Sequence, residues 1–412
     1  MIETFTLQNG IKGIVSKIDG VRSCSIGVFV KAGSCDETLA ENGISHFIEH
    51  TNFKGTPTRD AFKISWDSDA LGVILNAATS KEYTYYYVKT ISEHTEKAFD
   101  ILADIFVNST YPSEELEKEK GVVIEEINMY EDTPDDVCLT ELAMAFYGSG
   151  DGFGRSILGP KENIQRFTRN DILAYKAKYY TTDNLVLSFV GDVDVDQAKN
   201  LAERYFSAVP TSVSAKRLDK DLTPKFLKTS RVKDIEQAHL GLGFKAAGGM
   251  DEKASVYFDF ISNVLGGGMS SRLFQKIREQ LGLCYNIYSY SSPYVDTGML
   301  AVYAGLNGDN IGRAYEAIMS EIQDFKKSGI REGEFELVKE QIKSSLVFAQ
   351  ESTSAQMTAY GRKLLLYGEV YDFDDRLKKI NQVTLKEVND FIFDEMDVEN
   401  YSTSAVGRNP EL

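Results

Sequence analysis

The sequence predicts an α+β protein with two structurally similar halves, each a mostly antiparallel sheet packed with helices. Two observations support this fold class. Strand-like and helix-like segments follow one another without the strict alternation that is typical of a doubly wound sheet. Several segments also recur about 214 to 216 positions later in the 412-residue chain, which indicates a duplicated unit. A chain of this length is expected to contain two or three domains.

The first half begins with a strand and a helix. Residues 25–31 (SIGVFVK) form a short β-branched run before Gly33, as expected of a buried strand. Residues 42–53 are expected to form a helix, because Gly55-Thr56-Pro57 follows as a stop signal. The aromatic, β-rich residues 82–90 predict another strand. Further helices are expected at 93–107, 114–130 and 168–180, and a further strand at 184–190.

The second half repeats this order. Residues 240–246 (LGLGFKA) are similar to residues 26–32 (IGVFVKA) at an offset of 214. At an offset of 216, five residues recur in the same helix–strand context: Ile164, Thr168, Asn184, Val190 and Gly191 return as Ile380, Thr384, Asn400, Val406 and Gly407. We therefore expect one domain at 1–212, a polar, proline-containing linker at 213–231 and a homologous domain at 232–412.

The bulk composition excludes several classes of partner. The net charge of −17 disfavours nucleic-acid binding, which needs clustered Lys and Arg. No apolar run is long enough to span a membrane, and the first residues lack the basic and apolar regions of a targeting peptide. The cysteines are too sparse for a disulfide framework: Cys24, Cys35, Cys138 and Cys284. We expect a cytoplasmic protein with no nucleic-acid or membrane partner.

One pentapeptide combines the residue types of a catalytic zinc site. His46 and His50 are four positions apart, so on a helix their imidazoles share one face and can bind one ion. Glu49 borders that face, where a carboxylate can accept a proton from water beside the metal. The order H-x-x-E-H is the inverse of H-E-x-x-H and marks its own class of peptidases. The alternative is a pair of solvent-facing histidines on a polar helix.

A catalytic zinc usually has three protein ligands, so a third must come from elsewhere. The charged helix expected at 114–130 offers Glu119 and Glu126, which are seven apart and share one face. Glu125 is a competing neighbour. Spacing alone does not choose among the three, and each could be an ordinary surface carboxylate.

Longer runs resemble the pitrilysin-type zinc peptidases, most closely the bacterial relatives of the mitochondrial processing peptidase. The resemblance covers essentially the whole chain. The matching runs in the first half are Ser45–His50, Phe53–Thr56, Leu75–Thr84, Val123–Ile127, Met129–Asp132 and Gly154–Gly159. Those in the second half are Leu265–Phe274, Ile277–Glu279 and Gly282–Tyr285.

The resemblance implies a ligand set for one Zn²⁺ per chain. Glu126 stands 76 positions after His50, where the family has its third ligand beside the two histidines. Glu119 stands where the family has a glutamate that supports the site by orienting the ligands. At the 214 offset, the second half carries Phe260, Asn263 and Val264 instead of the motif and cannot bind zinc in this way. The expectation is therefore a catalytic domain at 1–212 and a non-catalytic, substrate-contacting domain at 232–412.

The resemblance also implies substrate-binding residues. Asn76 and Ala77 correspond to an edge-strand element that pairs with the substrate backbone, although Asn76 could instead be a turn residue. Arg278 and Tyr285, seven apart, correspond to a pair that holds the scissile region, with Tyr285 as a donor to the oxyanion. The alternative is a surface arginine and a core tyrosine.

Together these features predict a zinc-dependent endopeptidase that hydrolyses peptides or unfolded segments inside an enclosed chamber. The family implies a homodimer, with a monomer as the alternative. A non-catalytic scaffold or partner subunit and a slow peptide-binding module remain alternative functions. Two departures from the family are the polar pair Thr51-Asn52, in place of Met-Leu, and the segment around Trp66 and Asp67.

Overall fold

The computed structural model describes residues 2–211 and 221–412 as two compact units, each assembled from several stretches of chain. The first unit lies within Met1–Ile127, Ser156–Asp219 and Phe348–Tyr371, and the second within Asn128–Arg155, Lys220–Val347 and Asp372–Leu412. These units differ from the contiguous halves expected at 1–212 and 232–412. Residues 213–220 of the expected linker lie outside the described residues, and its last residues belong to strand β7 (Lys228–Val232).

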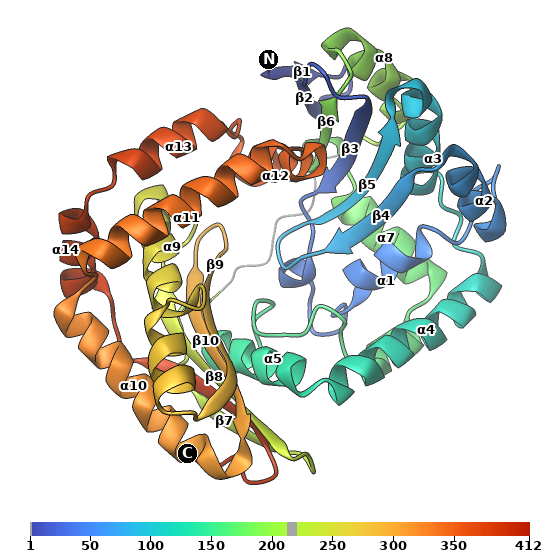
Figure 1. Cartoon of the computed structure of the whole chain (residues 1–412). Coiled ribbons are helices and arrows are strands. Elements are labelled where there is room, and N and C mark those ends of the chain that lie inside the picture. The colour runs from blue at the N-terminus through green and yellow to red at the C-terminus, as the bar shows by residue number, and fades with distance from the viewer. Residues whose placement is uncertain (1, 212–220) are drawn as a thin grey trace. The chain divides into compact units, whose positions relative to one another are not determined.

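The first unit contains a six-stranded sheet of order β1-β2-β6-β3-β5-β4 (Figure 1). β2 and β6 are parallel, and all other neighbours are antiparallel. Its strands are β1 (Ile2–Thr6), β2 (Lys12–Lys17), β3 (Ser23–Val30), β4 (Ile74–Thr79), β5 (Thr84–Ile91) and β6 (Leu185–Gly191). Its helices are α1 (Ile44–Thr51), α2 (Ala61–Leu71), α3 (Thr95–Val107), α4 (Ser113–Asp132), α6 (Lys161–Arg166), α7 (Arg169–Tyr179), α8 (Val195–Phe206) and α12 (Thr353–Tyr367), with α4 continuing into the second unit.

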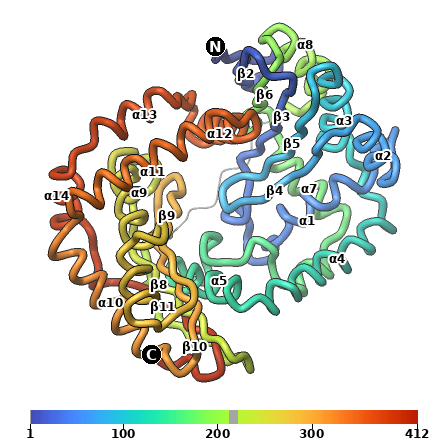
Figure 2. Tube along the Cα trace, in the orientation of Figure 1, coloured from blue at the N-terminus to red at the C-terminus, as the bar shows by residue number. Residues whose placement is uncertain are grey.

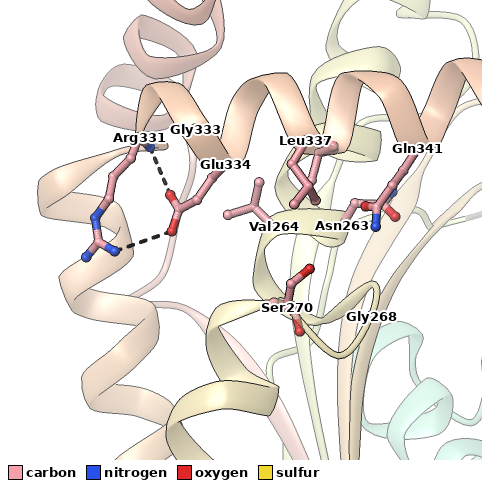
Figure 3. A pocket seen from close by; sticks show the side chains of 11 residues that line it. Asn263, Val264, Gly268, Ser270, Arg331, Gly333, Glu334, Leu337 and Gln341 are labelled. Atoms are coloured by element: carbon pink, nitrogen blue, oxygen red, sulfur yellow. Dashed lines mark hydrogen bonds and ion pairs between the residues drawn. The ribbon is translucent and has the colours of Figure 1, made fainter.

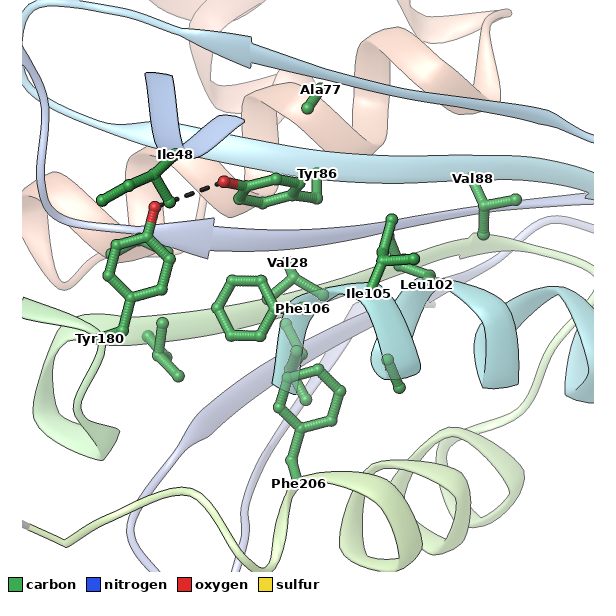
Figure 4. Packing of buried hydrophobic residues seen from close by; sticks show 14 of the residues in the cluster. Val28, Ile48, Ala77, Tyr86, Val88, Leu102, Ile105, Phe106, Tyr180 and Phe206 are labelled. Carbon is green, nitrogen blue, oxygen red and sulfur yellow. Dashed lines mark hydrogen bonds between the residues drawn. The ribbon is translucent and has the colours of Figure 1, made fainter. Parts of the chain in front are cut away.

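One face of this sheet buries the main core of the unit (Figure 4). Alternate residues of β3 and β5 pack there against apolar side chains of α3, as the period of two in a strand requires. Ile48 of α1 and Tyr180, after α7, join the same cluster, and the Tyr86 and Tyr180 hydroxyls are 3.4 Å apart. The helix that carries the two histidines is therefore anchored in the core through its apolar face.

The opposite face of the first sheet is covered by α12, although this helix comes from late in the chain (Figure 2). Small residues allow the close approach. The Ser188 hydroxyl donates to the carbonyl of Met357 at 3.0 Å. A methyl group added at Gly27 would lie 2.4 Å from Met357 Sδ, and one at Gly361 would lie 2.2 Å from the Phe29 ring. Glycine at both positions therefore permits this close packing, and a larger residue would force the neighbouring side chains to move.

The second unit contains a five-stranded sheet of order β7-β11-β8-β10-β9. β7 and β11 are parallel and the other neighbours are antiparallel. Its remaining strands are β8 (Gln237–Ala246), β9 (Cys284–Pro293), β10 (Gly298–Asn307) and β11 (Tyr401–Gly407). Its helices are α5 (Pro134–Tyr147), α9 (Glu252–Gly266), α10 (Ile311–Ser328), α11 (Glu332–Gln350), α13 (Phe373–Gln382) and α14 (Leu385–Glu395), with the end of α11 in the first unit. Among the described helices, none is both long and apolar enough to cross a membrane.

The two sheets share one topology, which confirms the α+β fold with two similar halves. Without β1, the strand orders correspond one to one, including the single parallel pair. The exchange of a helix is also reciprocal, because α5, from early in the chain, covers β8 and β11 of the second sheet. There a methyl group added at Gly241 would lie 3.2 Å from Leu142 of α5, and Cys138 Sγ lies 3.7 Å from the Ser404 carbonyl.

The repeated residues also occupy matching local structures. Thr168 begins α7, and Thr384 begins α14 in the same way. Each threonine side chain accepts from the backbone N–H three residues later, and an acidic side chain there, Asp171 or Glu387, accepts in return. The strand that follows is β6 in one unit and β11 in the other. The sequence repeat therefore reflects one helix–strand element used twice.

Candidate metal centre

The N-terminal end of α1 is fixed by a buried carboxylate. Glu37 accepts from the backbone N–H groups of Gly43 and Ser45 at 2.8 Å each, and from Asn42 Nδ2 at 3.1 Å. Burial raises the pKa of Glu37 even though these hydrogen bonds favour its ionised form. Gly43 precedes the helix with a φ of 98°, a conformation that favours glycine. Glu37 thus satisfies N–H groups that the first turn leaves unpaired.

The C-terminal end of α1 explains the unusual Thr51-Asn52 pair. Both side chains are fully buried, yet Thr51 Oγ1 donates to the Phe47 carbonyl at 2.7 Å and Asn52 Oδ1 accepts from the Tyr111 hydroxyl at 2.6 Å. Tyr111 has a φ of 53°, rare for a residue other than glycine, and stands just before α4. The polar pair therefore links the end of α1 to the start of the helix that carries Glu119 and Glu126.

Three side chains converge at the face of α1 that points toward α4. His46 Nε2 lies 3.6 Å and His50 Nε2 lies 3.3 Å from Glu126 Oε2. The three ligand atoms lie within 4.8 Å of one another. Zinc bonds of about 2.0–2.1 Å in a tetrahedral arrangement place ligand atoms roughly 3.3 Å apart. The geometry and the donor types therefore fit a zinc ion.

The hydrogen bonding of Glu126 supports this fit. Its Oε2 atom is buried, and among the described residues it has the two imidazole nitrogens nearby, at 3.3 and 3.6 Å, but no hydrogen bond of regular geometry. A metal ion bound between the two histidines would satisfy it. The alternative of two solvent-facing histidines is wrong for His46, which is 7% exposed. Burial and the neighbouring His50 lower the pKa of His46 to about 4, so its imidazole is neutral, as a ligand must be.

Glu119 orients one of the histidines. His50 Nδ1 lies 2.9 Å from Glu119 Oε1, and Lys54 Nζ lies 2.6 Å from Glu119 Oε2. Burial tends to raise the pKa of Glu119, but the bonds with His50 and Lys54 outweigh it and lower the pKa. The carboxylate orients the ring so that Nε2 faces Glu126. Despite burial, Glu119 and Glu126 raise the pKa of His50 to about 9, so a metal bound at Nε2 would displace a proton. Lys54 was not singled out from the sequence, although it lies in the matching run Phe53–Thr56.

Glu49 is held by a residue of the edge strand. Thr79 Oγ1, at the end of β4, donates to Glu49 Oε2 at 2.5 Å. Burial raises the pKa of Glu49, which makes its carboxylate a stronger base than an exposed glutamate. Thr79 was also not identified from the sequence, although it lies in the matching run Leu75–Thr84. The only signal was its position in that run, because no spacing rule relates residues 49 and 79.

Three of the other expected site residues lie on two different edge strands, and Arg278 lies in the helical segment Phe274–Gln280. Asn76 and Ala77 belong to β4, at the open edge of the first sheet, so the turn alternative for Asn76 is wrong. Asn76 Oδ1 accepts from the Ala77 N–H at 2.8 Å. Tyr285 lies on β9 of the second unit, is 48% exposed rather than in the core, and donates to Gln237 Oε1 at 2.9 Å. The Arg278 guanidinium lies 4.5 Å from the centre of the Phe274 ring.

The second unit has core residues where the first has metal ligands. Phe260 and Val264 of α9, at the 214 offset from His46 and His50, are almost completely buried. Neither residue type binds zinc, so the two histidines of α1 have no counterpart at these positions of α9. The Trp66 segment forms α2, where Trp66 is 62% exposed and its ring centre lies 5.9 Å from that of Phe62.

Similarity to known proteins identifies the family of this chain. The chain is 42% identical over 393 residues to a Bacillus subtilis protein named uncharacterized zinc protease YmxG, with 94% of each chain covered. The chain belongs to peptidase family M16. Residues 14–161 match the family described as Insulinase (Peptidase family M16), and residues 166–342 match the Peptidase M16 inactive domain. An uncharacterized zinc protease of Rickettsia felis is 35% identical over 384 residues, covering 93% of this chain and 92% of its own. The resemblance to pitrilysin-type zinc peptidases is thereby confirmed.

Two solved structures share the M16 fold over the whole chain. A peptidase M16 inactive domain from Pseudomonas fluorescens matches with a TM-score of 0.92 and 18% identity, covering 100% of this chain and 98% of its own. A protease from Helicobacter pylori matches with a TM-score of 0.90 and 21% identity, covering 99% of both chains. At these identities the likeness concerns the fold alone.

Proposed function

We propose that this M16 protein is a zinc-dependent endopeptidase that hydrolyses peptides or unfolded segments. The observation that carries the proposal is the convergence of His46, His50 and Glu126, with Glu49 on the same helix. A zinc ion held by these three ligands would polarise the peptide carbonyl and activate the attacking water. Its relatives named zinc proteases support this assignment.

Proton transfer in the proposed reaction is carried out by Glu49. Glu49 accepts a proton from the attacking water and delivers it to the leaving amine as the C–N bond breaks. Thr79 holds the carboxylate in place through the 2.5 Å hydrogen bond. The edge strand with Asn76 and Ala77 would pair with the substrate backbone, and Arg278 and Tyr285 would hold the scissile region. The proposal includes an enclosed chamber formed by a homodimer, which a measurement of molar mass in solution tests.

The deciding experiment is cleavage of a mixed peptide library, read by mass spectrometry. Zinc-loaded protein should cut, a chelator should abolish cutting and zinc should restore it. Glu49→Gln should bind zinc normally but lose about 10²–10⁴-fold in rate. Glu125→Gln, an exposed glutamate on α4, is the matched control and should retain the full rate. A folded, zinc-loaded protein that cuts nothing would favour the scaffold or peptide-binding alternatives.

A further inference from the structure

The second unit contains a pocket of about 420 Å³ between α9 and α11 (Figure 3). Asn263 and Val264 of α9 line it, together with Ser270 and Ser271 of the following loop and Leu337 and Val338 of α11. This volume lies within the range of small-ligand sites, which is about 300–1,000 Å³. A methyl group added at Gly268, in the same loop, would meet no atom within 4 Å, so this part of the wall is open.

The pocket occupies the place in the second unit that the metal site occupies in the first. Asn263 and Val264 stand at the 214 offset from Glu49 and His50. α11 follows β10 and α10 in the same order in which α4, with Glu119 and Glu126, follows β5 and α3. Three aliphatic residues, Val264, Leu337 and Val338, line this cavity between the two helices, together with polar side chains but without the two histidines of the first unit.

A buried hydroxyl in the pocket wall is left without a hydrogen-bond partner by the described residues. Ser271 is 6% exposed, and its Oγ atom has no hydrogen-bond partner among the described residues. Buried hydroxyl groups are normally satisfied, and leaving one unpaired destabilises the fold. A serine hydroxyl can both donate and accept, so either group of a bound amide would satisfy it.

The charges around the pocket favour a neutral ligand. Glu334 pairs with Arg272 through two contacts of 2.7 and 2.9 Å and with Arg331 at 3.5 Å. The Glu334 carboxylate is therefore already paired when the pocket receives a ligand. Val264 and Val338 are almost completely buried, and Leu337 is 44% exposed, so they supply an aliphatic wall.

We propose that this pocket binds one aliphatic residue of a peptide, with the side chain against the valines and the backbone amide at Ser271. A peptide residue matches the combination of an aliphatic wall, a free hydroxyl and the neutral amides of Asn263 and Gln341. The pocket would thus hold a peptide without cleaving it. The inference rests on the proposed peptidase function for the origin of the peptide, but binding itself requires no turnover.

The test is a titration of N-acetyl-leucinamide into the zinc-loaded, full-length Glu49→Gln protein, followed by methyl NMR of its valines and leucines. The signals of Val264, Leu337 and Val338 should shift and saturate. N-acetyl-glycinamide should bind at least about tenfold more weakly, because it lacks the side chain that the wall buries. N-acetyl-lysinamide should bind as weakly, because Glu334, the carboxylate that lines the pocket, is already paired with two arginines.

Substitutions at the pocket test whether the leucine probe binds there. Leu337→Asp should weaken binding at least about tenfold, because it puts a charge in the aliphatic wall. Leu281→Asp is the matched control, since Leu281 is also 44% exposed in the same unit but does not line the pocket, and it should bind normally. Ser270→Phe at the exposed rim should block the pocket without altering the core. Unchanged thermal unfolding would show that each variant is folded.

Two results would overturn the proposal: an absence of saturable shifts at Val264 and Val338, or equal binding of the leucine and lysine probes. The experiments distinguish a failure of the peptide-binding proposal from a failure of the peptidase proposal. A wild-type protein that cleaves peptides while its Glu49→Gln variant shows no such shifts refutes the pocket alone. A chain that binds the probe but never cleaves refutes the peptidase alone.

Discussion

Helices α1 and α9 occupy the same place in their two units but carry opposite kinds of residue. α1 presents His46, His50 and Glu49, whereas the matching positions of α9 place two apolar side chains in the core. At these two positions α9 is held by packing, and its polar contacts, the Asp251 cap and the Asp259–Arg376 pair, lie elsewhere on the helix. α1 is held at one end by Glu37 and at the other by the Asn52–Tyr111 bond. The difference teaches that a buried cluster of charged ligands requires polar support around it, which an apolar core does not.

The largest expected effect is on zinc affinity, where the proposed ligand Glu126 should differ from its neighbour Glu125. Glu126→Ala removes one of three ligands and should weaken zinc binding by more than about 100-fold, which exceeds the loss expected for an orienting residue. Glu125→Ala should bind zinc normally, because Glu125 is not part of the His46–His50–Glu126 group. Competition with a chelator of known affinity measures both. Equal losses in the two variants would contradict the assigned ligand.

Removing the orienting carboxylate should have a smaller effect. Glu119→Gln keeps the shape of the side chain but removes the charge that fixes His50 and pairs with Lys54. Zinc affinity should fall by about 10–100-fold, with one zinc still bound per chain at saturation. The same chelator competition and a metal analysis measure this. An unchanged affinity would show that Glu119 is only a structural carboxylate.

The contacts of α12 and α5 with their sheets should differ in how well they tolerate an added methyl group. Gly361→Ala places Cβ 2.2 Å from the Phe29 ring, so it should lower the free energy of unfolding by about 1–3 kcal/mol, although alanine favours a helix. Gly241→Ala places Cβ 3.2 Å from a flexible leucine and should change it by less than about 1 kcal/mol. Denaturant unfolding compares them, and equal effects would mean that both helices are packed with equal tightness.

A modest effect on stability is expected at the link from α1 to α4. Tyr111→Phe should lower the free energy of unfolding by about 1–2 kcal/mol, because the buried Asn52 side chain loses its donor. Asn52→Leu should cost a similar amount by removing the amide oxygen to which the Tyr111 hydroxyl donates. The double variant should cost less than the sum of the two, since no polar partner is left alone. Strict additivity in this cycle would mean that the bond contributes nothing.

The sequence predicted the parts of the site that depend on local spacing. Two histidines four apart on a helix share a face whatever surrounds them, and the structure places both beside Glu126. Spacing left Glu119, Glu125 and Glu126 equivalent, because the choice depends on how α4 lies against α1. Thr79 and Lys54 were missed for the same reason, since their contacts join segments that only the tertiary fold brings together.

The fold class and the duplication were predictable, but the exchange of α5 and α12 was not. Strand periodicity identifies β3 and β8 from their own residues. No local pattern states which helix will cover a sheet face that contains Gly27 and Ser188. The contacts that decide this connect residues more than 150 positions apart, and they depend on close packing rather than on hydrophobic pattern.

The covering of the first sheet by α12 sets an order of events during protein synthesis. The strands of that sheet are complete once β6 has left the ribosome, but the helix that covers their second face ends at Tyr367. At about 5–20 residues per second, the nascent chain carries this face uncovered for roughly 10–35 seconds. During that interval the exposed sheet face can aggregate. A chaperone bound to it, or a partly formed contact within the nascent chain, would prevent this.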